Sequence, residues 1–371
     1  MLSPATETEL SELVAGASGA LRIVGGGTRP IGRPVAGEVL SVVGLTGIEL
    51  YEPGALTIVV RAGTPLAEVE AALAAEGQRL PFEPMDHRAL LGTVGEPTIG
   101  GVVAANASGP RRIQAGAARD SLIGVRFVDG SGEIIKNGGR VMKNVTGYDL
   151  VKLMAGSWGT LGVLSEVAFK VLPAPEAAAS LSIGGLDTTR AVEAMAAALG
   201  SPFEVTGAAH LPGEGRTLLR IEGFAASVAY RAGRLANLLA PFGTVEVTQD
   251  ADDVGKTWRQ IRDVECFAGR GGDVWRLSVK PSDGPDLAAR TGGEVIHDWA
   301  GGLIWALVPE GTDLRAQLGE FAGHATLVRA SEEVRARIAP FQPEPAPLAK
   351  LSRGLRARFD PRGILNPGVM E

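Results

Sequence analysis

The stretch Tyr148-Asp149-Leu150-Val151-Lys152-Leu153-Met154-Ala155-Gly156-Ser157-Trp158-Gly159-Thr160-Leu161-Gly162-Val163-Leu164-Ser165-Glu166 decides the fold of this chain. Its first part predicts a short amphipathic helix, because Leu150, Leu153 and Met154 fall on one side. Three glycines follow at the spacing G-x-x-G-x-x-G, and an apolar strand begins directly after the third. Without a Cβ atom, such glycines let the backbone lie flat against a ligand. A plain helix-to-strand turn is the alternative for this segment taken alone.

A second glycine-rich segment, Gly25-Gly26-Gly27-Thr28-Arg29-Pro30, follows the predicted strand Leu21–Val24. A Rossmann dinucleotide site needs G-x-G-x-x-G at the start of a helix. Pro30 stands in place of the third glycine and Pro34 follows four residues later, so no α-helix is expected there. A run of bare backbone N–H groups can still bind a phosphate. The segment therefore favours a pyrophosphate loop outside the Rossmann class, with a purely structural turn as the alternative.

A third segment, Pro97–Gly109, lies within residues 78–121, where the sequence shows little regular pattern. Gly100 and Gly101 permit close approach, and Thr98 and Ser108 supply small polar groups. Long irregular stretches inside a compact domain are usually functional. Arg111 or Arg112, just beyond it, could balance the charge of a pyrophosphate, with a solvated surface arginine as the alternative.

The chain ends on a fourth segment, Phe359-Asp360-Pro361-Arg362-Gly363-Ile364-Leu365-Asn366-Pro367-Gly368. Asp360-Pro361-Arg362-Gly363 suits a type I turn, and the proline after Asn366 favours an extended backbone there. Together these features predict that the Asn366 amide is rigidly presented.

Composition excludes several classes of protein. The 371 residues suggest two domains, and the formal net charge of −6 argues against a nucleic-acid binder. Cys266 is the single cysteine, so this chain alone cannot hold a disulfide, a four-cysteine zinc site or an iron–sulfur cluster. The four scattered histidines have no metal-ligand spacing. With no signal peptide and no apolar run of the ~20 residues that cross a bilayer, we expect a cytoplasmic protein without direct membrane insertion.

An Ala-rich run, Ala174–Ala179, predicts a domain linker. From Leu181 the pattern alternates as strand–helix–strand twice, which is typical of a ferredoxin-like layer, and the segments Val274–Val279, Glu294–Asp298 and Ala325–Arg329 add strands. We therefore expect an α+β protein with domains at residues 1–175 and 176–340, and a C-terminal segment, 341–371, that returns to the first domain.

These segments resemble the FAD-binding domain of the vanillyl-alcohol oxidase/p-cresol methylhydroxylase (PCMH-type) superfamily. Within it, the chain most resembles the family of FAD-binding subunits E of bacterial glycolate oxidase. The clues run through the whole chain: Gly109-Pro110-Arg111-Arg112, Val141–Leu150, Val274–Ser278 and Gly323–Arg329. The resemblance implies a two-part FAD-binding domain over 1–175, completed by 341–371, and a ferredoxin-like cap or substrate domain between them.

The resemblance also implies cofactor contacts, residue by residue. The glycine loop would hold the pyrophosphate through its backbone, the Thr98 segment would line the pyrophosphate and ribityl chain, the residues at 162–163 would meet the adenosine end, and Asn366 would lie at the isoalloxazine. The implied FAD-binding set is Gly25, Gly26, Gly27, Thr28, Thr98, Ile99, Gly100, Gly101, Ser108, Gly109, Arg112, Gly116, Gly162, Val163 and Asn366.

The chain departs from the superfamily in two places. Covalent flavin attachment there uses a histidine, but the glycine loop has none, so we expect noncovalent FAD; His87 is the residual candidate for attachment. Related 2-hydroxy-acid dehydrogenases carry a His-x-Gly-Asp-Gly-Asn-type segment that supplies a base, and this chain lacks it. Arg276, which strand alternation places opposite Trp275 and Leu277, and His324 are the remaining candidates for a catalytic role, with a plain sheet-surface arginine as the alternative for Arg276.

The resemblance thus predicts an FAD-binding subunit of a heteromeric glycolate or D-lactate (2-hydroxy acid) oxidoreductase. Its partners would be a catalytic flavoprotein subunit and an iron–sulfur subunit, through which any membrane association would arise. Two alternatives stay open: a stand-alone FAD-dependent oxidase of a sugar or alditol, and a flavin-poor scaffold subunit.

Overall fold

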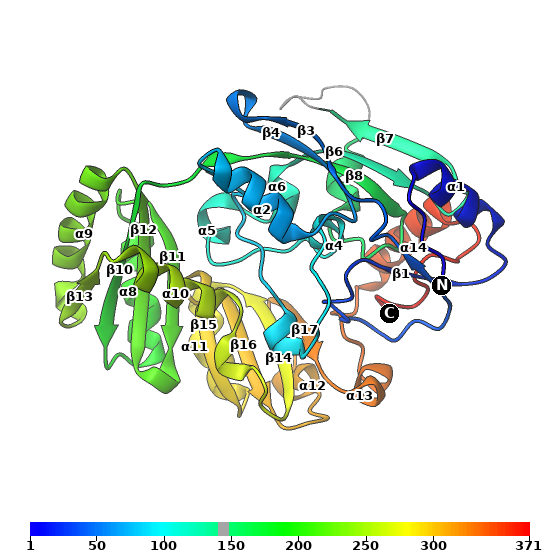
Figure 1. The fold of residues 1–371 in the computed structure, drawn as a ribbon. Coiled ribbons are helices and arrows are strands. Elements are labelled where there is room, and N and C mark those ends of the chain that lie inside the picture. Colours follow the sequence, from blue (N-terminus) through cyan, green and yellow to red (C-terminus); the bar gives the residue numbers. More distant parts are fainter. Residues whose placement is uncertain (140–147) are drawn as a thin grey trace. The chain divides into compact units, whose positions relative to one another are not determined.

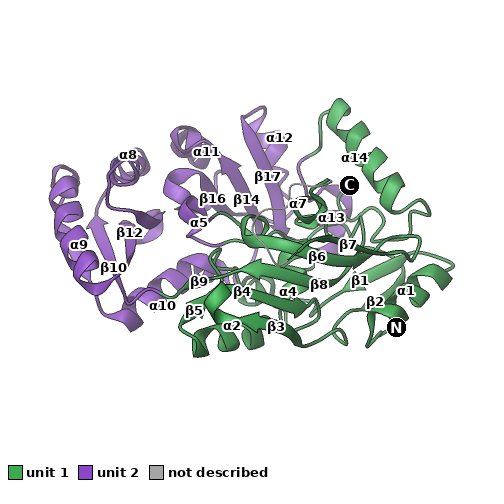
Figure 2. Cartoon of the chain, turned by 90° about the horizontal axis from the view of Figure 1, so that it is seen from above, with its two compact units in different colours: residues 1–108, 116–174, 343–371 green, residues 109–115, 175–342 purple. Residues whose placement is uncertain are grey.

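The computed structural model describes residues 1–139 and 148–371 (Figure 1). Part of the sequence resemblance, residues 141–147, lies outside the described residues. The chain divides into two compact units (Figure 2): unit 1 comprises Met1–Ser108, Gly116–Ala174 and Pro343–Glu371, and unit 2 comprises Gly109–Ala115 and Pro175–Gln342. This division differs from the expected boundaries chiefly at Gly109–Ala115, which lies in unit 2 and not with the sequence on either side of it.

Unit 1 is built on a five-stranded antiparallel sheet in the order β3-β4-β8-β6-β7. Its strands are β3 (Ile48–Glu52), β4 (Thr57–Arg61), β6 (Leu122–Val128), β7 (Ile134–Gly138) and β8 (Val163–Lys170). Two small sheets accompany it: the parallel pair β1 (Leu21–Val24) and β2 (Glu38–Ser41), and the antiparallel pair β5 (Gln78–Arg79) and β9 (Leu172–Pro173). Apolar side chains from the sheet, such as Phe127 and Phe169, form the core with those of the helices.

The helices of unit 1 are short, apart from three. They are α1 (Glu7–Gly16), α2 (Leu66–Ala75), α3 (Arg88–Leu91), α4 (Ile99–Ala104), α6 (Ala118–Ser121), α7 (Leu150–Met154) and α14 (Ala346–Phe359). The predicted helix before the three glycines is confirmed as α7, with Asp149 as its N-cap and Met154 in the core. Residues 78–121 are more ordered than their pattern indicates, because single helical turns such as α3 and α6 carry too few residues for a period to be visible.

The C-terminal segment joins unit 1 through a second apolar core. Ile364 and Leu365 pack there with Leu10, Leu21 and Val163. The backbone N–H of Leu21 donates to the carbonyl oxygen of Ile364 at 2.7 Å, and Asn366 N–H donates to Leu21 carbonyl at 3.0 Å. The last residues of the chain are therefore hydrogen-bonded to β1, the strand that leads into the glycine loop.

Unit 2 holds one eight-stranded sheet in the order β13-β10-β12-β11-β15-β16-β14-β17. The strands are β10 (Ala177–Gly184), β11 (Val205–Leu211), β12 (Arg216–Gly223), β13 (Val245–Thr248), β14 (Asp273–Val279), β15 (Glu294–Asp298), β16 (Leu303–Val308) and β17 (Gly323–Arg329). Its helices are α5 (Arg112–Ala115), α8 (Thr188–Leu199), α9 (Ala225–Leu239), α10 (Ala251–Arg262), α11 (Gly284–Arg290), α12 (Leu314–Leu318) and α13 (Glu332–Arg337).

The sheet of unit 2 is a tandem repeat. Its first half runs β10-α8-β11-β12-α9-β13 and its second half β14-α11-β15-β16-α12-β17, and in each half the first and third strands are central. The halves join where β11 pairs with β15, through the single register pair His210 and His297. The predicted ferredoxin-like alternation is confirmed for the first half. The sequence did not predict that the second half repeats it, since α11 and α12 have only seven and five residues.

Within residues 1–139 and 148–371, the structure contains no helix with both the length and the apolar character needed to cross a membrane.

Candidate functional site

The glycine loop continues directly from β1 without opening a helix. Gly27 has φ of +68°, in the left-handed region that favours glycine. The carbonyl oxygen of Val24 accepts from Val42 N–H at 2.9 Å, so the loop begins where the β1–β2 pair ends. The expectation that no Rossmann helix starts here is confirmed, because the next regular element is β2 at Glu38.

The third segment is bound to the loop that follows β4. Thr98 is the N-cap of α4, and its Oγ1 accepts from Gly101 N–H at 3.3 Å. Ile99 N–H donates to Thr64 carbonyl at 3.0 Å, and Gly100 N–H donates to Ala62 carbonyl at 2.8 Å. These backbone bonds fix Thr98 beside the glycine loop.

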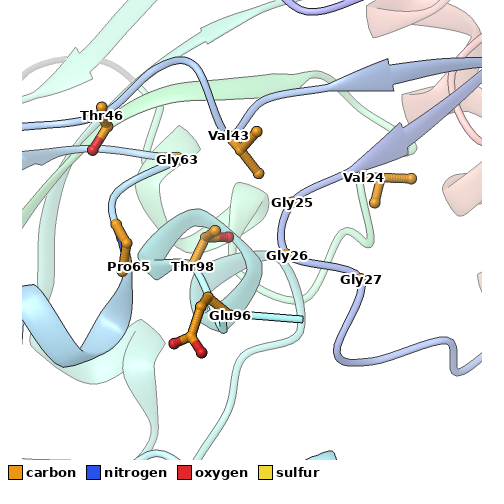
Figure 3. A pocket seen from close by; sticks show the side chains of 10 residues that line it. All are labelled: Val24, Gly25, Gly26, Gly27, Val43, Thr46, Gly63, Pro65, Glu96 and Thr98. Carbon is orange, nitrogen blue, oxygen red and sulfur yellow. The ribbon is translucent and has the colours of Figure 1, made fainter. Parts of the chain in front are cut away.

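A pocket of about 540 Å³ lies where these segments meet (Figure 3). Three of the predicted loop residues and Thr98 line it, together with residues from the loops after β2 and β4 that the sequence did not single out. The ten lining residues are Val24, Gly25, Gly26, Gly27, Val43, Thr46, Gly63, Pro65, Glu96 and Thr98. Sequence reasoning missed Val43, Thr46, Gly63, Pro65 and Glu96 because loop convergence depends on strand pairing, which no local motif reveals.

Glycine is required in this loop for more than one reason. A Cβ at Gly26 would lie 1.5 Å from the carbonyl oxygen of Glu96, and one at Gly25 would lie 2.5 Å from Thr98 Oγ1. Both glycines therefore permit close packing between the two loops. A Cβ at Gly27 would meet nothing closer than 4.0 Å, so this residue keeps open space at the pocket. The backbone cradle thus fits a flat, phosphate-bearing group, although two of its glycines also serve the protein's own packing.

A positively charged side chain, Arg29, lies near the pocket, although it is not one of the ten lining residues. Arg29, two residues beyond Gly27, is half-buried; burial lowers its pKa to about 10, an effect that Asp86 opposes. Its guanidinium donates to Met85 carbonyl and to His87 Nδ1, each at 3.1 Å. A Cβ at Gly101 would lie 3.7 Å from Arg29 Nη1, which places this cation next to the start of α4. The sequence analysis considered Arg111 and Arg112 for the pyrophosphate charge and did not single out Arg29, which lies two residues after Gly27.

Glu96 is the acidic residue in the pocket lining. Its carboxylate accepts from Arg88 at 3.1 Å, and Arg88 also pairs with Asp86 at 2.8 Å. The acidic charge at the pocket is therefore partly neutralised by an arginine. His87, the residual candidate for covalent attachment, has its Nδ1 occupied as the acceptor for Arg29.

The Asn366 amide links the C-terminal segment to β1, which leads into the glycine loop, and to the Gly156–Gly162 segment. Its Oδ1 accepts from Ile23 N–H and its Nδ2 donates to Trp158 carbonyl, both at 2.8 Å. Asn366 is only 8% exposed. The extended backbone expected before Pro367 is wrong, because Asn366 has φ of +43°, in the left-handed region. The two hydrogen bonds, and not the proline, hold the amide in place. Trp158 itself has φ of +52°, a strained value for a residue other than glycine.

The other predicted FAD contacts in unit 1 lie outside the pocket lining. Thr28 and Ile99 are buried, and Gly100 packs so closely that a Cβ would be 2.7 Å from Ala62. A Cβ at Gly162 would lie 2.5 Å from Phe127, and Val163 starts β8 in the core. Gly101 lies next to Gly100 in α4. Gly116 has φ of +74°, in the left-handed region. Ser108 is the last residue of the first segment of unit 1, Met1–Ser108.

Gly109 and Arg112 belong to unit 2, where they contact Trp299. The Trp299 indole N–H donates to Gly109 carbonyl at 3.1 Å, and the Arg112 guanidinium lies 4.9 Å from the ring centroid. Arg111, the other candidate for the pyrophosphate charge, forms an ion pair with the buried Glu222. Within the structure, Arg111 therefore neutralises a carboxylate of unit 2.

Arg276 reaches the same tryptophan from β14. Its guanidinium lies 5.0 Å from the Trp299 ring and 6.0 Å from that of Trp305. The predicted alternation is confirmed, because Trp275 and Leu277 are in the core while Arg276 is half-buried. Burial, and then the positive charge of Arg112, lowers the pKa of Arg276 to about 10, and Asp298 opposes this. Two guanidinium groups thus stack on one indole.

His324 is affected by the positive charges of Arg276 and Arg112. It is register-paired with Ser278 on β14, two residues from Arg276. Desolvation, then the charges of Arg276 and Arg112, lowers the pKa of His324, so the ring is neutral at pH 7. The structure therefore brings the two predicted catalytic candidates, Arg276 and His324, into one electropositive cluster of unit 2.

Comparisons with known proteins agree with this geometry. A family model described as an FAD binding domain matches residues 1–138. The glycolate oxidase subunit GlcE of Escherichia coli (strain K12) is 36% identical over 342 residues, which cover 92% of this chain and 89% of that subunit. The chain belongs to the GlcE family. It is an FAD-binding oxidoreductase, and the sequence resemblance is confirmed.

One further relative matches part of this GlcE-family chain, and two solved structures share its fold. A D-lactate dehydrogenase of Anaerostipes hadrus is 34% identical over 166 residues, which are 45% of this chain and 33% of that enzyme. The solved structure of p-cresol methylhydroxylase superposes with a TM-score of 0.68 at 14% identity, covering 99% of this chain and 88% of that one. An alkyldihydroxyacetonephosphate synthase gives a TM-score of 0.70 at 16% identity, covering 98% and 76%. The expected PCMH-type fold is therefore confirmed.

Proposed function

We propose that this chain is the FAD-carrying subunit of a heteromeric oxidoreductase for a small 2-hydroxy acid such as glycolate or D-lactate, and that it passes electrons to partner subunits. The observation that carries the proposal is the convergence of Gly25–Gly27 and Thr98 on one pocket, in a chain of the GlcE family. The relatives named as a glycolate oxidase subunit and a D-lactate dehydrogenase support the substrate class.

In this proposal the pocket holds the diphosphate of FAD. The loop backbone presents N–H groups, Gly27 leaves room for close approach, and Arg29 supplies a positive charge next to α4. Asn366 fixes the loop indirectly, because it ties β1 to the Trp158 carbonyl. FAD supplies the hydride- and electron-accepting ring when it is bound. The remaining predicted contacts in unit 1 stay proposals for the same cofactor: Thr28, Ile99, Gly100, Gly101, Ser108, Gly116, Gly162 and Val163. Gly109 and Arg112, in unit 2, stay separate proposals.

The FAD is proposed to be noncovalent. The glycine loop carries no histidine, and the nearest one, His87, uses Nδ1 to accept a hydrogen bond from Arg29. Acid precipitation should therefore leave the yellow colour in solution. A pellet that stays yellow would contradict this part of the proposal.

The stacked arginines of unit 2 are proposed to bind the carboxylate of the acid. The guanidinium groups of Arg276 and Arg112 both lie over the Trp299 ring. The negative charge of Asp298 partly offsets the effect by which burial and Arg112 lower the pKa of Arg276. A guanidinium held on an indole is pre-oriented for a planar carboxylate. Neutral His324 beside it could accept a proton at a ring nitrogen. Unit 2, which comprises the expected domain at 176–340 together with Gly109–Ala115, would then be the substrate domain.

Calorimetric titration of the purified chain with glycolate and D-lactate tests the carboxylate site without activity. Arg276→Lys keeps the charge and Arg276→Gln removes it, so the two variants separate charge from geometry. We expect Arg276→Gln to weaken binding roughly tenfold or more, the range of a lost charged hydrogen bond. Equal binding by wild type and Arg276→Gln would remove the cluster from the substrate site.

The iron–sulfur step is assigned to another chain, because Cys266 is the single cysteine here. The GlcE relative, and the GlcD subunit of Bacillus subtilis that is 36% identical over 121 residues, are both named as subunits of glycolate oxidase. These names support an oxidase of several subunits. We propose that the partners are a catalytic flavoprotein subunit and an iron–sulfur subunit. Comparison of dye-linked turnover by the isolated chain and by the co-expressed complex tests the heteromeric function.

A further inference from the structure

The three leucine side chains of helix α14 (Ala346–Phe359) are exposed to solvent. Leu348, Leu351 and Leu355 are 52%, 65% and 42% exposed. The residues that face the rest of unit 1 are Ala349, Ser352 and Arg356, all half-buried, and the helix has no fully buried residue. An ordinary surface helix does the opposite and buries its apolar stripe.

The three leucines form one continuous stripe, because their spacings of three and four residues repeat once per helical turn. The exposed apolar residues at α9 (Ala225–Leu239) form no such stripe. Phe224, Tyr230 and Leu238, at α9, are separated by six and eight residues, so they do not follow one another from turn to turn and form no continuous stripe. The stripe on α14 is therefore a patterned surface, unlike scattered exposed apolar residues, which need no explanation.

Positive charge continues around the exposed side of the helix. On the helical projection Arg358 lies next to the leucine stripe, and Lys350 and Arg353 lie on the side of the helix beyond Arg358. All three side chains are exposed. Between Ala346 and Phe359 the helix contains no Asp or Glu, although the whole chain has a formal net charge of −6. A complementary surface would be apolar on one side and acidic on the other.

We propose that the outer face of α14 is the docking site for a partner subunit of the same oxidase, seated in an apolar groove of that subunit bordered by carboxylates. This inference rests on the proposed heteromeric function. The mode is that of an amphipathic helix in a groove, with leucines as anchors and arginines at the border. The helix leads directly into Phe359, whose ring lies 6.0 Å from Phe127 in the core, so the docked element is continuous with the flavin-binding unit.

A second copy of the chain fits this face less well. An α14–α14 pair about a two-fold axis would bring the same acid-free surface to both sides, and the arginines would find no carboxylate on the opposite helix. A membrane surface would also favour basic residues, but interfacial helices carry a broad apolar face rich in aromatic residues. On α14 the exposed apolar side chains of this size are the three leucines.

The test uses the full chain with an affinity tag, co-expressed with its flavoprotein and iron–sulfur partner subunits. Leu351→Glu combined with Leu355→Glu should reduce co-purified partner roughly tenfold or more, because it removes two anchors and adds charge that repels acidic groups. Arg353→Glu with Arg358→Glu should weaken the complex and its dependence on salt. Tyr230→Ser is the matched control, since Tyr230 is 65% exposed, as Leu351 is.

Flavin content and melting temperature of each variant show that unit 1 is folded. If the double leucine variant retains flavin and full partner binding, the docking proposal is wrong while the heteromeric function stands. If wild-type chain captures neither subunit yet turns over alone, the proposed function itself fails. Leucine-dependent binding to anionic vesicles, or a leucine-dependent homodimer in sedimentation, would overturn the proposal in favour of a membrane or of a second copy.

Discussion

The Asn366 side chain donates a 2.8 Å hydrogen bond to the carbonyl oxygen of Trp158, more than 200 residues earlier in the chain. The same amide accepts from Ile23 at the end of β1. A Cβ at Gly159 would lie 2.8 Å from Asn366 Nδ2, so the glycine after Trp158 makes room for this amide. One buried side chain thus holds together the glycine loop, the Gly156–Gly162 segment and the C-terminus.

Asn366→Ala should destabilise unit 1 and weaken FAD binding. It leaves the Ile23 N–H and the Trp158 carbonyl without their partner, and each lost buried partner costs about 1–3 kcal/mol. Asn366→Asp is the matched variant, because it keeps an acceptor for Ile23 but loses the donor to Trp158. Thermal melts with and without added FAD measure both effects. An unchanged melt and flavin content for Asn366→Ala would show that the clamp has no consequence.

Gly26 and Gly27 should differ when they are replaced. Gly26→Ala puts a Cβ 1.5 Å from Glu96 carbonyl, so it forces the two loops apart and should lower the stability of apo and flavin-bound protein alike. Gly27→Val has space but a φ of +68°, which costs about 1–2 kcal/mol, and its side chain enters the surroundings of the pocket. We expect it to lose most flavin while the apo protein still melts cooperatively. Full flavin in purified Gly27→Val would contradict a diphosphate at this loop.

Arg29→Gln should weaken FAD binding by roughly tenfold and reduce its dependence on salt, because the variant removes a partly desolvated charge next to α4. Arg29→Lys keeps the charge but cannot reproduce the fork that reaches Met85 and His87. It should fall between wild type and Arg29→Gln. Equilibrium titration of apo protein with FAD at two salt concentrations measures both quantities. Identical affinities in all three proteins would exclude Arg29 from the site.

The sequence predicted the elements that carry strong local patterns. The glycine segments, the helix before Gly156 and the alternation of β14 were recognisable because each depends on neighbours in the chain. The strands at 274–279, 294–298 and 325–329 were predicted, but not β16 (Leu303–Val308), an all-apolar run without alternation, or the tandem repeat that it completes. Six buried residues in a row give no period-two signal.

Residues of the site could be predicted from the sequence only where the residue type itself has a chemical reason to be at a phosphate site. Thr98 and Gly27, which line one pocket, could be singled out because small residues allow close approach to a phosphate. Arg29 was not singled out beside Arg112, because a lone arginine has no spacing to distinguish it. Only the fold shows that Arg29 lies by Gly101, and that Arg112 stacks on Trp299 in unit 2.

The stability of unit 2 should fall in acid, because two buried histidines, His210 and His297, lie where β11 pairs with β15. His210 and His297 are buried with ring centroids 6.0 Å apart, and His297 has no hydrogen-bond partner at either ring nitrogen in the described protein. Burial, then His210, lowers the pKa of His297 to about 4, and burial also lowers the pKa of His210. Both rings are therefore neutral when folded, and the unfolded chain binds protons first.

Stability from this pair is fully present above the unfolded pKa near 6.5 and declines as the pH falls toward 4, by at most about 1.4 kcal/mol per pH unit for each histidine. Denaturant unfolding of unit 2, followed by tryptophan fluorescence between pH 7.5 and 4.5, measures the decline. His297→Leu should flatten the curve, since it removes the imidazole whose pKa burial lowers to about 4. A wild-type curve as flat as that of His297→Leu would show that the pair does not titrate in this way.

The central claim is that this chain carries FAD but works as one part of a heteromeric oxidase. The most direct measurement is dye-linked oxidation of glycolate and D-lactate, expressed per flavin, by the isolated chain and by the chain co-purified with its flavoprotein and iron–sulfur partners. We predict that the isolated protein is yellow and turns over at a small fraction of the rate of the complex. Equal turnover per flavin would contradict the subunit assignment and identify a stand-alone oxidoreductase.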